Sequence, residues 1–344
     1  MTQIHLLPSW NAPWAVLSAL AHVADSPQPA HHVVAWCDGT GRRLLDRPGV
    51  STATLGKRWP WDPLALWRWW RLLARRPGQV VHLWGGLSQG GAATLVAAAG
   101  RTVLHVLDAE DLETAFRLEQ RGTSAPARIE LSRPWYDWAA QRFSRWRSCL
   151  HEASSGTGWV AEVPWHEPLL SPTEKQRLEQ LLAGEGPLVL GYDGGHDPEA
   201  IKLLLWAADI LCTTAASLQF CFTSPCPPPA GAIRFWATLR TRDRICWLPW
   251  SGVLGSVLPK ATLLWWNDPA DLTLLLPRKA LLQRLPVAGW PATLQGLQRE
   301  FPGQIARVEK DPYSLASVSL LLLQQGGPSI PPGTLVQLEP GHLP

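Results

Sequence analysis

Short apolar runs alternate with longer segments of helical periodicity along most of the chain. The runs are continuous, as strands buried on both faces are, and the segments between them place apolar residues three or four positions apart. Such alternation predicts βαβ units and a parallel sheet. In the first half it predicts strands at residues 3–7, 32–37, 51–55, 79–84 and 102–107, and helices at 11–22, 62–76, 92–100 and 134–147.

A second alternating series follows a proline-rich join at residues 164–172, after two short predicted strands at 148–155 and 158–165. Prolines interrupt regular structure, so the join is the best candidate for a linker. The series predicts strands at 187–190, 218–222, 244–248, 262–266, 285–288 and 304–308, and helices at 172–182, 199–211, 230–239, 252–258, 270–283, 294–300 and 311–325. We therefore expect domains at 1–165 and 166–325 and a Pro- and Gly-rich tail at 326–344.

The segment 277–287, PRKALLQRLPV, is predicted to be a helix that leads into a strand beginning at Pro286 and Val287. The free N–H groups and the dipole at a helix N-terminus attract anions when that end lies at the edge of a parallel sheet. This stretch is therefore a candidate anion site.

Composition narrows the class of protein. The 344 residues exceed one ordinary core, and 46% hydrophobic with 17% charged residues is a globular composition. A net charge of +3 gives no argument for a nucleic-acid partner. The six cysteines lack metal-ligand spacing, and we expect Cys221 and Cys226 to be reduced rather than bridged. With no leader pattern and no run long enough to span a bilayer, a cytoplasmic protein is expected.

Tryptophan is unusually abundant, at 21 residues, and often adjoins arginine. Most of it is expected to fill cores, although stacking and cation–π pairs are an alternative. In the helix predicted at 62–76, a helical wheel places arginines on one face and Leu66, Trp70 and Leu73 on the opposite face. Packing of that apolar face on the sheet is the favoured interpretation, and peripheral contact with an anionic membrane surface is the alternative.

Several stretches are similar to GT-B glycosyltransferases of the family 4 type. DRICWLPW, TLLWWNDPAD, KALLQRLPV and IARVEKDPYSLASVSLLLL follow the order and spacing of that family's C-terminal domain, and QVVHLW and LHEASS resemble two of its N-terminal strands. The resemblance implies an α/β protein of two Rossmann-like domains whose parallel sheets face a central cleft. It also implies transfer of a sugar from a nucleotide sugar to an acceptor, with no metal and no other cofactor.

The resemblance also implies positions for site residues. His82 and Asp108 would face the transferred sugar as catalytic residues. The donor would be held near Gly191, Lys202, Asp271, Arg278 and Lys279. Asn11 and Ser88 would lie on the acceptor side.

The donor motif departs from the family at three positions. Lys279 stands where a Glu would accept hydrogen bonds from the ribose hydroxyls, and an ammonium can only donate. Tyr192 and Glu199 stand where an Arg and a Lys would neutralise the diphosphate. A second alignment register would put Leu276 and Arg284 at the two Glu positions. Two hypotheses follow: a divergent glycosyltransferase, or an inactive GT-B protein that binds or scaffolds.

Three further motifs have two interpretations each. GGLSQGG, from Gly85, could cradle an anion or form a plain strand-to-helix turn. GYDGGHDP could hold a metal through Asp193, His196 and Asp197, but a Gly- and Asp-rich turn is favoured. In the acidic loop predicted at 108–113, the carboxylates could supply a base or favour a helix N-terminus.

Overall fold

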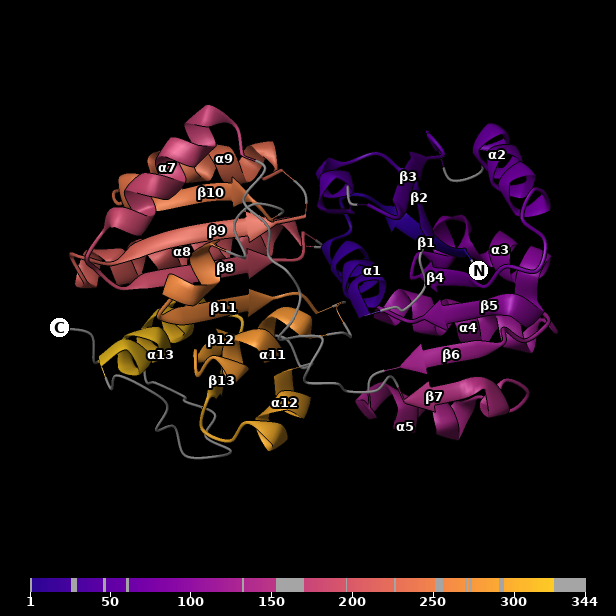
Figure 1. Cartoon of the computed structure of the whole chain (residues 1–344). Coiled ribbons are helices and arrows are strands. Elements are labelled where there is room, and N and C mark those ends of the chain that lie inside the picture. The colour runs from indigo at the N-terminus through magenta and orange to yellow at the C-terminus, as the bar shows by residue number, and fades with distance from the viewer. Residues whose placement is uncertain are drawn as a thin grey trace. The chain divides into compact units, whose positions relative to one another are not determined.

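The chain forms two compact units in a computed structural model, one from Met1–Pro164 with Ala270–Thr273 and one from Trp165–Pro269 with Leu274–Pro344. The structure describes residues 2–25, 30–45, 48–59, 62–131, 133–152, 170–195, 197–225, 227–250, 256–269, 271, 274–290 and 294–324. Each unit is an α/β layer structure built on one parallel sheet (Figure 1).

The sheet of the first unit has seven strands in the order β3-β2-β1-β4-β5-β6-β7, all paired in parallel. Its strands are β1 (Gln3–Ser9), β2 (His31–Cys37), β3 (Val50–Thr54), β4 (Val81–Trp84), β5 (Thr102–His105), β6 (Arg128–Leu131) and β7 (Leu150–Glu152). The order reverses between β1 and β4, and ligands of such sheets bind beyond the carboxyl ends of strands at that kind of position.

Helices cover both faces of the first sheet. They are α1 (Pro13–Asp25), α2 (Pro63–Ala74), α3 (Ala92–Ala98), α4 (Ala109–Gln120) and α5 (Arg133–Arg142). On one face, Leu6, Leu83 and Leu104 form an apolar core with residues of α2 to α5, such as Trp69. The alternate strand positions point to the other face, where α1 contacts β1 and β4.

The second sheet has six parallel strands in the order β10-β9-β8-β11-β12-β13. They are β8 (Leu188–Asp193), β9 (Gln219–Ser224), β10 (Ile245–Pro249), β11 (Leu263–Asn267), β12 (Val287–Gly289) and β13 (Ile305–Arg307). The helices are α7 (Pro172–Ala183), α8 (Pro198–Thr214), α9 (Ala230–Thr238), α11 (Leu275–Leu282), α12 (Leu294–Glu300) and α13 (Pro312–Gln324).

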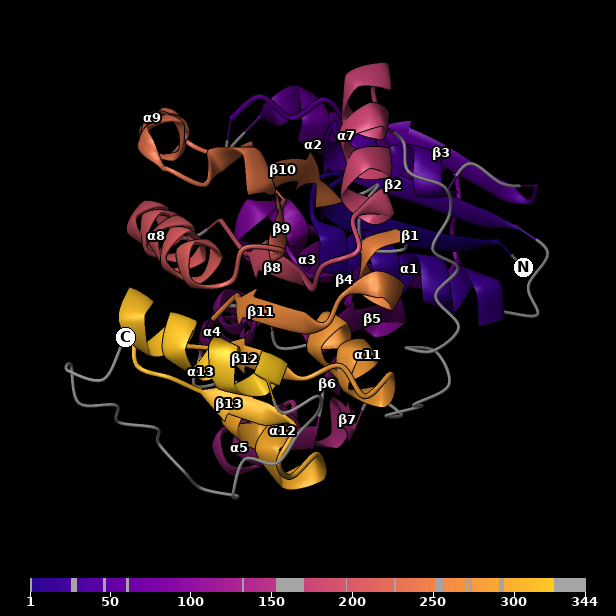
Figure 2. The same ribbon diagram turned by 90° about the vertical axis from the view of Figure 1, so that its left-hand side faces the viewer.

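The core of the second unit lies between its sheet and the helices α8, α9 and α13, where Phe220, Phe222 and Trp265 are fully buried. Figure 2 shows α8 and α13 side by side on this face, with α11 on the opposite one, where it contacts β11 and β12. Ser171 and Glu174 form a capping box that begins α7.

The predicted α/β class is confirmed, and most strand positions agree within a few residues. Several local predictions are wrong, and strand β6 was not predicted. The predicted acidic loop is the first turn of α4. The helix predicted from residue 270 begins at Leu275, and Trp70 on α2 is 56% exposed while Trp69 takes the buried position.

Other predictions fall outside the described residues: the strand at 158–165, most of the linker at 164–172, much of the helix at 252–258, Cys226 and the tail at 326–344. Among the helices that the structure describes, none combines the length and the hydropathy needed to cross a bilayer.

Candidate functional site

A pocket of about 320 Å³ opens at the carboxyl ends of neighbouring strands in the second unit. Asn267 ends β11, Trp290 follows β12, and Arg307 ends β13. Its remaining lining comes from Asp197, Pro269, Val308, Glu309 and Lys310. The carboxyl edge of a parallel sheet is where α/β folds bind their ligands, and the volume lies in the range of small-molecule sites.

A buried carboxylate holds the side chain of Asn267, one of the residues that line the pocket. Asp193 accepts a hydrogen bond of 2.6 Å from the Asn267 side-chain amide and one of 2.9 Å from the backbone N–H of Gly195. A side chain at Gly194 would collide with Asp268, because an added Cβ would lie 2.5 Å from its carboxyl carbon. These contacts favour the turn interpretation of GYDGGHDP, in which Asp193 is structural. The described residues contain no cluster able to hold a metal ion, and His196 lies outside them.

Asp197 and Lys310 form an ion pair across the pocket. Asp197 also caps α8, since its side chain accepts from the N–H of Glu199. The hydrogen bond from Lys310 holds the pKa of the Asp197 carboxyl below its usual value. The pocket is therefore lined by two cations, Arg307 and Lys310, of which Lys310 is paired with Asp197, and by the carboxylate of Glu309.

Three of the predicted donor residues have structural roles and do not line this pocket. Gly191 is inside β8, not after it, and an added Cβ would lie 2.3 Å from the Phe222 ring. Lys202 pairs with Glu199 at 2.7 Å, and Arg278 pairs with Glu300 at 2.8 Å. The prediction of a loop from residue 191 is therefore wrong, because β8 continues to Asp193.

The three departures from the family motif have separate explanations. Tyr192 is fully buried and stacks on Trp266 with ring centroids 4.8 Å apart, so it serves the core. Glu199 is exposed in the first turn of α8, where its charge suits the helix dipole. Lys279 is 7% exposed on α11, and burial lowers the pKa of its ammonium group.

Asp271, the other predicted donor residue, is buried and belongs with the first unit, where it forms an isolated antiparallel bridge with Asp108. Asp108 caps α4 by accepting from the N–H of Asp111 at 2.7 Å. The structure thus brings Asp108 and Asp271 together through their backbones.

The GGLSQGG turn already contains a carboxylate. Asp111 accepts from the backbone N–H groups of Gly86 at 3.1 Å and Leu87 at 2.8 Å, in the manner of an anion cradle occupied from within. Gly85 has a positive φ of 69°, and an added Cβ would lie 2.6 Å from the same carboxylate. Desolvation, together with the charge of Asp108, raises the pKa of Asp111 to about 8. The N–H groups of this motif are therefore used to hold the turn against α4. Ser88, which belongs to the motif, is exposed.

Replacing Asp111 with Ala tests this interpretation. It should lower the free energy of unfolding by about 2 kcal/mol, because two buried N–H groups lose their acceptor. Urea denaturation measures this loss. Glu110→Ala, an exposed neighbour on the same helix turn, is the control and should change stability by about 0.5 kcal/mol or less. Equal stability of Asp111→Ala and wild type would show that the turn does not depend on the carboxylate.

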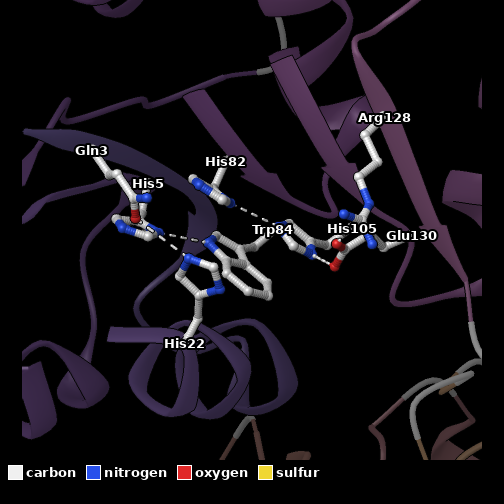
Figure 3. A network of polar contacts seen from close by, with 8 residues as sticks. All are labelled: Gln3, His5, His22, His82, Trp84, His105, Arg128 and Glu130. Carbon is white, nitrogen blue, oxygen red and sulfur yellow. Dashed lines mark hydrogen bonds and ion pairs between the residues drawn. The ribbon is translucent and has the colours of Figure 1, made fainter. Parts of the chain in front are cut away.

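A cluster of five histidines lies on the α1-covered face of the first sheet, and only His82 was singled out from the sequence. Figure 3 shows His5, His22, His82 and His105 of this cluster. Its members are His5, His22, His31, His82 and His105. Four come from strands β1, β2, β4 and β5 and one from α1. His5 and His82 are register partners on adjacent strands, whereas His31 is opposite Gln3 and His105 is opposite Trp84, so the sequence carries no single positional signal for the cluster.

Hydrogen bonds fix the orientation of these rings. The Trp84 indole N–H donates to Nδ1 of His5 at 3.1 Å, so the proton of a neutral His5 is on Nε2, which faces Nδ1 of His31 at 3.0 Å. His105 presents Nδ1 to the Glu130 carboxylate at 2.9 Å and Nε2 to Nδ1 of His82 at 3.0 Å. Trp84 also stacks on His105 with ring centroids 3.7 Å apart.

Burial and repulsion from neighbouring histidines favour the neutral forms of His5 and His82. Desolvation and the neighbouring histidines lower the pKa of His82 to about 2, and the same causes hold the pKa of His5 well below its usual value. His82 is 5% exposed. Asn11, predicted on the acceptor side, is half-buried in the turn after β1, where its N–H donates to Ser9 Oγ at 3.1 Å.

The sequence matches no protein-family model and no curated protein. The structure is similar to solved structures across nearly its whole length. HepE of Anabaena, in complex with UDP and glucose, has a TM-score of 0.63 and 15% identity over 95% of this chain and 92% of its own. The chain has the GT-B fold.

Two further structures with this fold show how widely it is used. A putative UDP-N-acetylglucosamine 2-epimerase from Listeria monocytogenes has a TM-score of 0.64 and 13% identity over 96% of this chain and 92% of its own. A sucrose-phosphate synthase from Thermosynechococcus elongatus has a TM-score of 0.58 and 14% identity over 95% and 90%. At such identities the similarity establishes the GT-B fold expected from the sequence. The activity has to be argued from the residues of the site.

Proposed function

We propose that the chain is a divergent glycosyltransferase that binds a nucleotide sugar at the carboxyl edge of its second unit. The observation that carries this proposal is the pocket of about 320 Å³ lined by Asn267, Trp290, Arg307 and Lys310, in a GT-B protein. Solved structures of similar fold hold UDP or UDP-glucose, which makes a UDP-sugar the first donor to test.

The lining residues suit the parts of such a donor. The Trp290 ring offers a stacking surface for a base. Arg307 and Lys310 can neutralise a diphosphate, which is where charge develops as the leaving group departs. Asn267, anchored by Asp193, can exchange hydrogen bonds with hydroxyl groups.

Some of the residues predicted from the family resemblance keep a role at the proposed site, and others are assigned a structural role. Asp271 and Asp108, which lie together, remain the carboxylates proposed to act at the sugar. His82 would act through the histidine cluster, in which it contacts His105, and not by direct contact. Lys279 remains a proposed donor residue, while Gly191, Lys202 and Arg278 support the surrounding fold.

Calorimetric titration with UDP, GDP and UDP-glucose tests the donor site. Arg307→Ala is expected to weaken binding about tenfold, because a charge-assisted contact to phosphate is lost. Arg240→Ala, an exposed arginine elsewhere in the second unit, is the matched control and should bind as wild type does. Absence of binding for all these nucleotides, or equal affinity of Arg307→Ala and wild type, would contradict the proposed site.

An inactive binding protein is the second candidate, and one observation favours it. Lys202 and Arg278, the cations that could replace those of the family motif, are each paired with a glutamate of their own unit. Nucleotide binding without turnover would support this candidate. Release of UDP from a UDP-sugar that is lost in a folded Asp271→Ala variant would contradict it and support the transferase.

A further inference from the structure

Two cysteines of the second unit are partners in the register of its sheet. Cys221 lies in β9 and Cys246 in β10, and the parallel pairing of these strands places the two residues opposite one another. Register partners in neighbouring strands have Cα atoms about 4.8 Å apart. A disulfide bond joins Cα atoms that lie between about 4.4 and 6.8 Å apart, so the sheet holds these cysteines at a separation that a bond can span.

Both side chains point to the same face of the sheet. Phe220 and Phe222, on either side of Cys221, belong to the core between the sheet and α8, α9 and α13. Ile245, next to Cys246, belongs to the same core. Since side chains alternate along a strand, the two cysteines point to the opposite face. Figure 2 shows α7 on that face, where it contacts β10.

The two thiols interact with each other and differ in exposure. Cys221 is fully buried, whereas Cys246 is partly exposed on β10, which is an edge strand of the sheet. Burial, together with a hydrogen bond to Cys246, raises the pKa of the Cys221 thiol well above its usual value. By contrast, the thiols of Cys37 and Cys212 donate to backbone oxygens.

We propose that Cys221 and Cys246 form a reversible disulfide bond when the protein is exposed to hydrogen peroxide. The Cys246 thiolate attacks one peroxide oxygen and the O–O bond breaks, which converts Cys246 to a sulfenic acid and releases one water. The Cys221 sulfur then attacks the Cys246 sulfur and displaces its hydroxyl, which leaves as a second water with the Cys221 proton. The two thiols lose two electrons in all, and the peroxide gains both.

The different exposure of the two residues assigns the order of these steps. The thiolate is the nucleophile in cysteine chemistry, and a buried thiol with a raised pKa supplies little of it. Cys246, which solvent reaches at the sheet edge, is therefore the residue that meets the peroxide, and Cys221 is the residue that closes the bond.

The bond would fix the edge strand β10 to β9. It would close a loop that contains α9, because α9 lies between the two strands in the chain. Closing a loop restricts the unfolded chain and so favours the folded one. Oxidation is therefore expected to raise the urea concentration at the midpoint of unfolding by about 1 M.

The inference does not depend on the proposed transferase activity, so it is tested on the full chain without a nucleotide sugar. The reduced protein is treated with hydrogen peroxide, its remaining thiols are alkylated after unfolding, and its peptides are mapped by mass spectrometry. We expect two peptides joined through Cys221 and Cys246, with a mass lower by two hydrogens than the sum of the free peptides. Dithiothreitol should separate them and return the urea midpoint to that of the reduced protein.

Matched serine variants identify the partners. Cys246→Ser should abolish both the linkage and the shift of the urea midpoint. Cys226→Ser removes the other cysteine near Cys221 in the sequence and should behave as wild type does. Circular dichroism checks that each variant is folded. A bond from Cys221 to Cys226, a sulfinic acid at Cys246 with Cys221 still a thiol, or equal urea midpoints for the oxidised and reduced wild type would overturn the inference.

Discussion

Replacing His5 and His82 together with Asn is expected to make the protein more resistant to acid than wild type, by about 4 kcal/mol between pH 7.5 and pH 5. Both histidines are buried in the cluster under α1, and both have pKa values well below 6.5 in the folded protein. The expectation concerns the change in the stability difference between the two proteins as the pH falls. The variant loses the same hydrogen bonds at every pH. The resulting loss of stability is constant and therefore cancels when its stabilities at two pH values are subtracted.

The sign follows from where protons bind. Below about pH 6.5 an unfolded histidine takes up a proton, while His82 in the folded chain does so only near pH 2. The unfolded state then binds more protons, so stability falls as the pH falls. At pH 5 each such histidine costs about 2 kcal/mol relative to pH 7.5.

Asn is the suitable replacement because its amide can imitate the ring nitrogen Nδ1. At position 5 it can accept from the Trp84 indole, and at position 82 it can reach Nε2 of His105. Urea denaturation at several pH values measures the stabilities. His151→Asn, an exposed histidine on β7, is the control and should leave the pH dependence unchanged. Parallel stability curves for the double variant and wild type would contradict the prediction.

Asp111 acts in the opposite sense, which is why the pH dependence of the variant's stability is compared with that of wild type. The pKa of its carboxyl is raised to about 8 in the folded chain, first by desolvation. Between about pH 4, near the pKa of an aspartate in the unfolded chain, and about pH 8, the folded chain therefore binds one proton more than the unfolded chain. The stability that this proton contributes is lost as the pH rises. Both proteins contain Asp111, so its effect cancels in their difference.

The fold was predictable from the sequence because continuous apolar runs and helical periodicity report burial directly. Strand β6 escaped prediction since its sequence, RIEL, is short and half charged, and its burial comes from pairing with β5 and β7. Trp70 was assigned to the core because a wheel treats Trp69 and Trp70 as alternatives. Packing of Trp69 against Trp36, with ring centroids 6.2 Å apart, decides between them.

The candidate site was harder to predict because its residues are gathered by tertiary structure. Trp290 follows β12, whereas Arg307 ends β13 and Lys310 lies in the connection directly after it, and only the pairing of β12 with β13 brings these two segments together. Motif comparison directed attention to Gly191, before the position of the family's Arg, and to Lys202 as a substitute for the family's Lys, but these residues have packing and ion-pair roles. The histidine cluster was hard to predict for the same reason. Its members are spread over about a hundred residues, and the parallel pairing of the strands places the strand histidines on one face of the first sheet.

Gly191→Ala is expected to destabilise the second unit by about 3 kcal/mol, a large effect for one methyl group. The added Cβ would lie 2.3 and 2.4 Å from two carbons of the Phe222 ring. Phe222 is fully buried, and its ring is stacked with those of Phe220 and Trp247 and contacts Trp265. The ring therefore cannot rotate away without disturbing the core.

Replacing Phe222 with a smaller residue tests whether Gly191 has a packing role or a binding role. Phe222→Leu alone should cost less than the 3–5 kcal/mol typical of removing a whole buried ring. In the double variant the loss should be smaller than the sum of the single losses by about 1 kcal/mol or more, because Leu leaves space for the methyl group. Urea denaturation of the four proteins gives this coupling.

Nucleotide titration of the same four proteins completes the test. If Gly191 is a packing residue, the folded Gly191→Ala protein should bind UDP as wild type does, since Gly191 does not line the pocket. Unchanged stability with lost binding would instead support the donor contact that the family motif implies. The outcome decides between two roles for β8: direct contact with the proposed nucleotide, or support of the pocket through Asp193, which holds the lining residue Asn267.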